Sequence, residues 1–343
     1  MLNMINTIFR GDCRPTMLSK LNGILQKYIP LFAPLGLLVG GILGERITSY
    51  TFLVTWLFAF MTFSGSLNSN FTHIRNSFSR PLPIIMTVVI LHAVMPLFVW
   101  LIGHFLFSDD PYIIIGLVLA FVIPTGITSF IWVSMYKGHI GLTLSVILIS
   151  SMLSPFIVPV SMTLFAGSKV KIDFWDMMMG LLMMIVIPSI LGMVLNNMTH
   201  GAIKTVLGDK LAPFAKLSLI FIITINGAKV VPYLKNVDSS IFKIAIVVVL
   251  LAGTGYLLGF IISTVFKWDK EIRVSLIFNG GMRNLGAGTV LALTYFPSPV
   301  LLPIIIAMLF EQLLASLCGV MIKRFGSDAN TKTNKKIPSQ INH

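Results

Sequence analysis

The feature that most constrains this chain is a polar interruption inside one of its long apolar runs. Residues 271–294 are about as long as a spanning helix, yet the middle of the run, 278–289, reads Phe-Asn-Gly-Gly-Met-Arg-Asn-Leu-Gly-Ala-Gly-Thr. Backbone groups in hydrocarbon must be hydrogen-bonded, so irregular chain at that depth needs surrounding protein or a watery cavity. Glycine enters non-helical conformations easily, and a charged side chain inside the membrane marks a functional-site hypothesis. The stretch therefore predicts a broken helix that forms half of a transport site.

The composition of the chain places it among polytopic membrane proteins. Of its 343 residues, 56% are hydrophobic and only 11% are charged, with a mean hydropathy of +0.91. Soluble domains carry about 25% charged residues. The net charge of +13 would suit a nucleic-acid partner, but most Lys and Arg lie in short loops and tails between apolar runs, as in membrane proteins. We therefore expect a lipid bilayer and no nucleic acid as partner. Cys13 and Cys318 alone do not predict a disulfide framework.

Apolar runs recur along the chain and predict its domain organisation. We expect a cytoplasmic N-terminal segment at 1–27, a ten-helix membrane domain at 28–325 and a polar cytoplasmic tail at 326–343. Each run approaches the roughly 20 residues that a spanning helix needs. The predicted spans are 28–44, 51–67, 82–107, 112–136, 140–166, 174–195, 211–231, 240–266, 271–294 and 299–322.

The charged loops predict how these spans are oriented. Lys and Arg gather on alternate loops together with both chain ends, for example at Lys137, Lys204 and Lys267. The opposite loops are mixed or acidic, as at Asp109 and Asp110. Because positive loops stay in the cytoplasm, we expect an integral, multi-pass plasma membrane protein with both termini cytoplasmic.

Two spans are interrupted in matching places, which predicts an inverted repeat. The fourth contains Pro124–Gly126 and the ninth contains Asn279–Gly288. Proline disrupts the helix before it, so both spans should break near the midplane. Because each half has an odd number of spans, repeat one (28–167) and repeat two (172–325) would enter the membrane from opposite sides. Paired broken helices point to the binding site of a secondary transporter. The predicted helix-break residues are Pro124, Gly126, Gly280, Gly281, Gly286 and Gly288.

At these residues the chain resembles the bile acid:sodium symporter family of secondary transporters. Gly281–Gly286 is similar to the family's Gly-Met-Gln-Asn-Ser-Gly, and the segment from Ser129 to Pro155 matches in its Lys137-Gly138 and Ser154-Pro155 pairs. The resemblance implies a panel of spans 1, 2, 6 and 7 and a core of spans 3–5 and 8–10, in which broken helices 4 and 9 cross. It also implies sodium at that crossing, the substrate beside it, and movement of one bundle against the other.

Several positions at which the resemblance implies sodium ligands carry other residues in this chain. The acidic ligand of the ninth span aligns with Asn279, which offers an uncharged oxygen. The glutamine after Gly-Met aligns with Arg283, which has donors and no acceptor. The Ser-Asn pair of the fourth span reads Ser129-Phe130, so one amide is lost.

The third and fifth spans depart from the family pattern as well. Thr143 can replace one hydroxyl of the fifth span, but Ile147 stands where the second would be. The third-span glutamine falls on Leu91, beside His92. Hard cations prefer several oxygen ligands, and the set that is left is small. The candidate sodium ligands are Ser129, Thr143 and Asn279.

Arg283 offers a physical alternative to sodium. Its guanidinium could occupy the place of a cation, hold the crossing together and attract an anion. We therefore hypothesise a transporter of a small organic anion, bile-acid-like or a carboxylate, whose sodium symport is weakened or replaced. A structural alternative pairs Arg283 with Glu311 in the tenth span. Glu311 could instead carry a coupling proton, so a proton-coupled or uncoupled carrier stays open. Sodium is the one cofactor considered.

Other polar residues of the spans have both functional and structural interpretations. Asn279 and Asn284 suit a binding site, or they cap broken helix ends. The hydroxyls of the fourth and fifth spans suit ligands, or they bond back to their own helices. His92 could titrate or pack between helices, and Asn226 could face the cavity from the panel. The predicted substrate or ion-site residues are His92, Ser129, Phe130, Thr143, Asn226, Asn279, Arg283, Asn284 and Glu311.

Two other classes of function are alternatives to transport. An ion channel is the main alternative because glycine-rich breaks also form selectivity filters. Two dissimilar broken helices per chain, however, fit alternating access better than a symmetric pore. An enzyme is not expected, since the sequence has no His-Glu-x-x-His, Gly-x-Ser-x-Gly or phosphate-loop motif.

Overall fold

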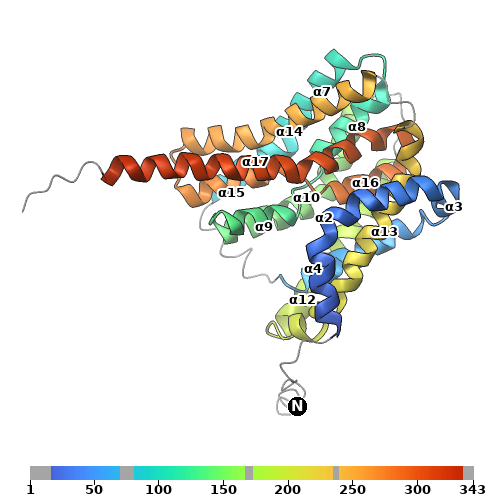
Figure 1. Cartoon of the computed structure of the whole chain (residues 1–343), viewed down its shortest axis with the longest axis horizontal. Coiled ribbons are helices and arrows are strands. Elements are labelled where there is room, and N and C mark those ends of the chain that lie inside the picture. The colour runs from blue at the N-terminus through green and yellow to red at the C-terminus, as the bar shows by residue number, and fades with distance from the viewer. Residues whose placement is uncertain (1–16, 70–80, 167–172, 235–238, 335–343) are drawn as a thin grey trace, which may run out of the picture.

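The computed structural model describes residues 17–69, 81–166, 173–234 and 239–334, and every regular element within them is a helix (Figure 1). Six helical stretches are long and apolar enough to cross a membrane, and two apolar helices are shorter. The predicted class, an all-α membrane protein, is confirmed, whereas the ten-span inverted repeat stays a prediction. The six stretches are 81–106, 140–165, 174–198, 204–229, 240–265 and 298–323, and the shorter helices are 53–66 and 111–122.

One group of helices is organised around a close parallel pair. The pair is α2 (Met17–Leu43) and α13 (Asp209–Leu234), with α4 (Leu53–Ser66) and α12 (Ile187–Met198) beside it. Glycines let the two backbones meet, because a Cβ on Gly40 would lie 1.8 Å from the Thr224 carbonyl oxygen. The group also includes α3 (Glu45–Thr48), α11 (Phe174–Leu181) and the π-helical segments η3 (Leu182–Val186) and η4 (Lys204–Gly208).

The second group surrounds two short helices that are buried on all sides. Every residue from Ile113 to Val122 of α8 (Pro111–Val122) is buried, and so is every residue from Val274 to the end of α15 (Lys270–Gly281). Asp110 and Asp269 cap these helices by accepting from the amides of Ile113 and Ile272. The helices around them are α6 (Pro81–Val89), η1 (Ile90–Val94), α7 (Met95–Leu106), α9 (Thr128–Met135), α10 (Ile140–Ala166), α14 (Ser239–Val265), α16 (Leu285–Tyr295), η5 (Ser298–Val300) and α17 (Leu301–Asn334).

The two groups meet at one end and diverge at the other. At the closed end α13 contacts α16, α17 and η5, and α10 contacts α11 and η3. Figure 1 shows α9 and α15 running to one side of the molecule while α12 runs to another. The outline is therefore a wedge whose closed end is held by contacts between the groups.

Two wide π-turns each end two residues before a proline. The segment Ile90–Val94 precedes Pro96, and Leu182–Val186 precedes Pro188. A proline ring clashes with the carbonyl four residues earlier, which is His92 in the first case. A π-bulge relieves this clash and shifts the side chains of the turn around the helix.

The helix ends differ from the sequence prediction at both termini. Helix α2 begins at Met17, so residues 17–27 of the predicted N-terminal segment continue the first helix. Helix α17 runs to Asn334, into the tail predicted at 326–343. Cys13 and residues 1–16 lie outside the described residues. The run 17–27 mixes polar and apolar residues and the run 326–334 is polar, but neither contains a proline that would end a helix.

Candidate functional site

The breaks in the two buried helices touch each other. Helix α8 ends at Val122 and α9 begins at Thr128, while α15 ends at Gly281 and α16 begins at Leu285. The backbone N–H of Asn284 donates to the Pro124 carbonyl across 2.8 Å. Each break thus satisfies a backbone group that the other leaves open.

The glycines near the second break have another role than the sequence suggested. Only Met282–Asn284 is non-helical, whereas Gly280 and Gly281 end α15 and Gly286 and Gly288 lie within α16. A Cβ on Gly281 would lie 2.3 Å from the Tyr256 ring. Gly280 and Gly281 therefore let α14 approach α15, and the glycines predicted as helix-break residues of this span lie on both sides of the break rather than within it.

Gly126 in the first break permits a close backbone contact. A Cβ there would lie 3.0 Å from the Arg283 carbonyl oxygen and 3.3 Å from Asn284 Cα. Together with Pro124, which ends the helical pattern, it lets the first break pass directly over the second.

Arg283 fills the space between the two broken helices with a buried guanidinium. The residue is 3% exposed. Its Nε donates to the Phe121 carbonyl at 3.2 Å, and Nη1 donates to the Gly280 and Met282 carbonyls at 2.9 and 3.2 Å. These carbonyls lie at or just beyond the C-terminal ends of α8 and α15, where helical hydrogen bonds stop. A cation is favourable at a helix C-terminus, so two helix ends stabilise this charge.

Glu311 of α17 reaches the same break by another route. Its Oε1 accepts from the backbone N–H of Arg283 at 3.0 Å, and its Oε2 accepts from Gln312 Nε2 at 3.3 Å. The hydrogen bonds of the guanidinium go to carbonyls instead. The predicted pairing of the two side chains is thus corrected: the carboxyl holds the backbone of the break.

The three residues predicted as sodium ligands come together in the structure. Ser129 Oγ lies 3.0 Å from Asn279 Oδ1, and Asn279 Nδ2 donates to Thr143 Oγ1 at 3.1 Å. The same Nδ2 donates to the Ser275 carbonyl at 2.8 Å. All three residues are buried. They therefore satisfy one another, and none of them is a carboxylate that would favour a bound cation.

His92 meets the first break because of the π-turn that carries it. Its Nδ1 lies 3.1 Å from the Val122 carbonyl oxygen, next to the carbonyl that Arg283 binds. A carbonyl only accepts, so Nδ1 carries the proton and Nε2 is an acceptor. That Nε2 has no partner among the described residues. Leu91, the neighbouring position, is also buried but is apolar.

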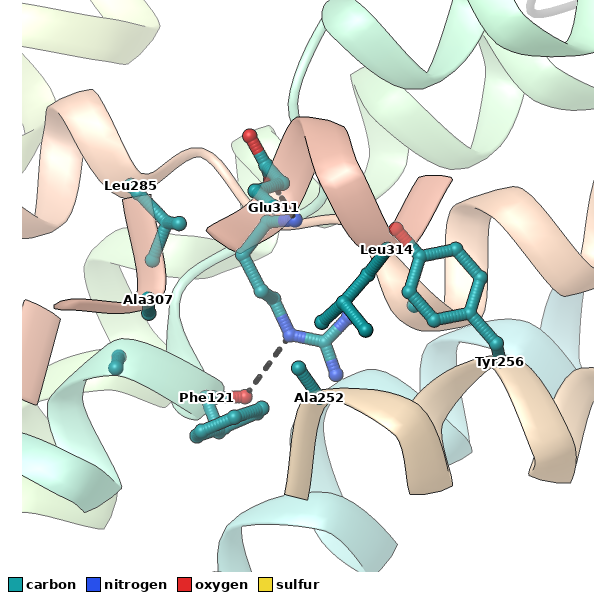
Figure 2. A pocket seen from close by; sticks show the side chains of 10 residues that line it. Phe121, Ala252, Tyr256, Leu285, Ala307, Glu311 and Leu314 are labelled. Atoms are coloured by element: carbon teal, nitrogen blue, oxygen red, sulfur yellow. Dashed lines mark hydrogen bonds between the residues drawn. The ribbon is translucent and has the colours of Figure 1, made fainter. Parts of the chain in front are cut away.

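A pocket of about 280 Å³ lies beside the guanidinium. Figure 2 shows Tyr256 and Glu311 at this pocket with Phe121 across from them. Arg283 Nη2 and the Tyr256 hydroxyl are buried there without hydrogen-bond partners among the described residues. Tyr256 has no signal in the sequence, because only its packing on Gly281 brings it to the site. The remaining lining residues are Ala120, Phe121, Ala252, Gly281, Leu285, Ala307 and Leu314.

Three predicted residues lie at the edge of this arrangement or outside it. The Asn284 side chain caps α16 by accepting from the Ala287 amide at 3.3 Å, which is the structural interpretation of that residue. Phe130 is partly exposed on α9. Asn226 of α13 is 1% exposed and neither of its amide atoms has a partner among the described residues, but it does not line the pocket.

Comparisons with known proteins agree on one family. Residues 55–237 match the model of the Sodium Bile acid symporter family. The uncharacterized protein YbaS of Bacillus subtilis is 49% identical over 87% of this chain and 97% of its own length. The uncharacterized sodium-dependent transporter YocS of the same organism is 26% identical over 72% of this chain and 78% of its own. A probable sodium/metabolite cotransporter of Oryza sativa chloroplasts is 25% identical over 61% of this chain and 50% of its own.

Proposed function

This chain belongs to the sodium bile acid symporter family, and from that premise we propose that it carries a small organic anion by alternating access, with Arg283 in the place of sodium. The family consists of transporters, so the prediction of a membrane transporter rather than an enzyme is confirmed. The substrate class, the transport cycle and the role of Arg283 are the proposal.

The hydrogen bonds of the guanidinium are the observation that carries this proposal. They gather three backbone carbonyls from the ends of two broken helices around one permanent positive charge. A mobile cation between two helix C-termini would have the same electrostatic reason to bind there. Because the cation is covalently attached, the crossing is stabilised whether or not sodium is present.

The neighbouring polar cluster does not fit a sodium ion. Ser129, Thr143 and Asn279 supply three side-chain oxygens, fewer than the six or more that hard cations such as Ca²⁺ take from carboxylates, carbonyls and water. Those oxygens already serve a mutual hydrogen-bond network. A sodium ion would have to break these bonds without gaining a carboxylate. We therefore assign the cluster to fixing α9, α10 and α15 against one another.

The arrangement of the helices supports the transport cycle that we propose. The helix group around α2 and α13 would be the panel, and the group around α8 and α15 the core, together giving ten spans in two inverted repeats. The groups are in contact at one end and diverge at the other, where the loops predicted as cytoplasmic lie (Figure 1). This shape is that of a carrier open to the inside. We place it in the plasma membrane with both termini cytoplasmic.

Uptake in the presence and absence of sodium tests this function. Proteoliposomes would be loaded with unlabelled butanoate, pyruvate or cholate, and counterflow of the labelled anion would be measured in sodium and in choline buffer. We expect saturable counterflow of at least one anion, equal in both buffers. An absolute sodium requirement would contradict the proposal, and flux without saturation would favour a channel.

Asn279→Asp sharpens the same experiment. It adds a carboxylate between the Ser129 and Thr143 hydroxyls, which gives sodium the charged ligand it lacks. We expect the variant to become sodium-stimulated while the wild type does not. Glu271→Asp, at an exposed position in the first turn of α15, is the control and should behave like the wild type.

A further inference from the structure

The pocket beside Arg283 holds two hydrogen-bond donors that lack acceptors. Arg283 is 3% exposed and Tyr256 is 6% exposed, and both residues line the pocket. Arg283 Nη2 and the Tyr256 hydroxyl are buried and have no hydrogen-bond partner in the part of the chain that the structure describes. A buried polar group without a partner costs about 1–3 kcal/mol, and more when it is charged. Two such groups on residues that line one cavity favour an acceptor that comes from outside the chain.

We propose that this pocket binds a monocarboxylate anion together with one proton, the anion on Arg283 Nη2 and the Tyr256 hydroxyl and the proton on Glu311. The proposal rests on the proposed function, because it names the substrate's head group and the coupling ion of that transporter. It also accounts for a glutamate in the pocket that neither the helix break nor sodium requires in ionised form.

The walls of the pocket favour a short carboxylate with an aliphatic chain. Apart from Arg283, Tyr256 and Glu311, the lining side chains are those of alanine, leucine and phenylalanine, with one glycine. A guanidinium binds carboxylates with strong, charge-assisted hydrogen bonds. A short aliphatic acid matches this lining, with its carboxylate on the guanidinium and its hydrocarbon chain against the apolar walls.

The count of charges explains why a proton should accompany the anion. With Glu311 ionised, the pocket holds one positive and one negative charge, and a bound carboxylate would leave an uncompensated negative charge in a buried site. Protonation of Glu311 removes that excess. The new O–H can also donate a hydrogen bond to an oxygen of the bound carboxylate.

Other ionisable groups around Glu311 do not supply this switch. Arg283 stays charged. Tyr256 approaches from α14, Cys318 lies two turns further along α17, and His92 faces Arg283 from η1. Tyr and Cys side chains are neutral near pH 7, and His92 is not among the residues that line the pocket. Among the residues that line the pocket, Glu311 is the one carboxyl group.

Thermodynamic linkage couples the binding of the anion to the binding of the proton. If a proton on Glu311 strengthens anion binding by some factor, the anion strengthens proton binding by the same factor. Coupling between two sites is typically about 5- to 150-fold. The pocket would thus load an anion and a proton together and move no net charge.

Binding measured at two pH values tests the proposal directly. Butanoate is the probe for calorimetry on the purified full-length protein at about pH 6 and about pH 8, since carboxylates with pKa values near 4–5 stay ionised at both. We expect the Kd to be about 5- to 150-fold lower at the acidic pH. Uncharged butanamide should not bind measurably. Equal butanoate affinity at both pH values, or equal binding of butanamide, would overturn the proposal.

Variants separate the proton site from the anion site. Glu311→Gln should bind butanoate with the acidic-pH affinity at both pH values, whereas Glu271→Gln, an exposed carboxyl, should keep the wild-type pH dependence. Tyr256→Phe should weaken binding about tenfold at both pH values. Glu311→Gln that retains the pH dependence would exclude Glu311 as the proton site. If that variant does not fold, the wild-type pH comparison and Tyr256→Phe still decide the question.

The outcome is distinguishable from a failure of the proposed function. Sodium-independent counterflow without pH-linked butanoate binding would remove this pocket as the site and leave the transporter proposal intact. Sodium-dependent counterflow with pH-linked butanoate binding would contradict the sodium-independent transporter and leave this pocket as the binding site.

Discussion

The two helix breaks look alike in the sequence but differ in what they contribute. The first, at 123–127, carries no charge, and with the end of α8 it offers carbonyls at Phe121, Val122 and Pro124. The second, at 282–284, supplies donors to two of them, the Arg283 guanidinium and the Asn284 amide. One break is thus mainly an acceptor and the other mainly a donor. The crossing is held by this complementarity rather than by symmetry of the two halves.

Removing the charged donor of the second break should have the largest effect on stability and transport. In Arg283→Gln, three carbonyls lose a charged partner, and each buried unsatisfied group costs about 1–3 kcal/mol. We expect a loss of stability of roughly 3 kcal/mol or more, together with loss of anion counterflow. Thermal unfolding in detergent, with and without sodium, measures both the loss and any rescue by the ion.

An exposed arginine provides the control for that experiment. Arg46→Gln in α3 should stay within about 0.5 kcal/mol of the wild type. If Arg283→Gln were as stable as Arg46→Gln and did not respond to sodium, the guanidinium would not be the element that joins the two breaks.

The position of the breaks could be predicted because their signals are local. Pro124 lacks an amide and ends the helical pattern wherever it occurs, and a polar Arg-Asn pair inside an apolar run needs a non-lipid environment. The same reasoning placed Asn279, Ser129 and Thr143 in one cluster through the family resemblance. Fold class and the neighbourhood of the site were therefore accessible before any coordinates.

The partners of each group could not be predicted, because they depend on packing. The sequence indicates that a carboxyl within a span, Glu311, needs a donor, but Arg283 offers a backbone N–H as well as its guanidinium, and only the path of α17 selects the backbone. His92 reaches the first break through a π-turn that Pro96 forces. Tyr256 is brought in by the close approach of α14 to Gly281. None of these three contacts can be recognised from the spacing of residues in the sequence.

A methyl group placed between the breaks should have an intermediate effect. In Gly126→Ala, the new Cβ would lie 3.0 Å from the Arg283 carbonyl oxygen, so the second break must move away. Overpacking of this kind costs about 1–3 kcal/mol. The melting temperature of the purified variant should fall accordingly. In the control, Gly286→Ala, the nearest atom would be 3.5 Å away, and alanine should be neutral or slightly stabilising in this helix. Equal effects of the two substitutions would mean that the breaks are not in close contact.

The smallest effect is expected at His92 of η1, which supports the first break by donating to its Val122 carbonyl. His92→Phe keeps an aromatic ring in the π-turn but removes the donor to the Val122 carbonyl. One neutral hydrogen bond contributes about 1 kcal/mol, and the fully buried carbonyl left behind adds to that cost. His104→Phe is the matched control, because its Nδ1 bonds the Trp100 carbonyl within its own helix at an exposed position. Thermal unfolding should rank His92→Phe below His104→Phe. A reversed order would show that Val122 needs no partner, and that the donors of the second break suffice to hold the first.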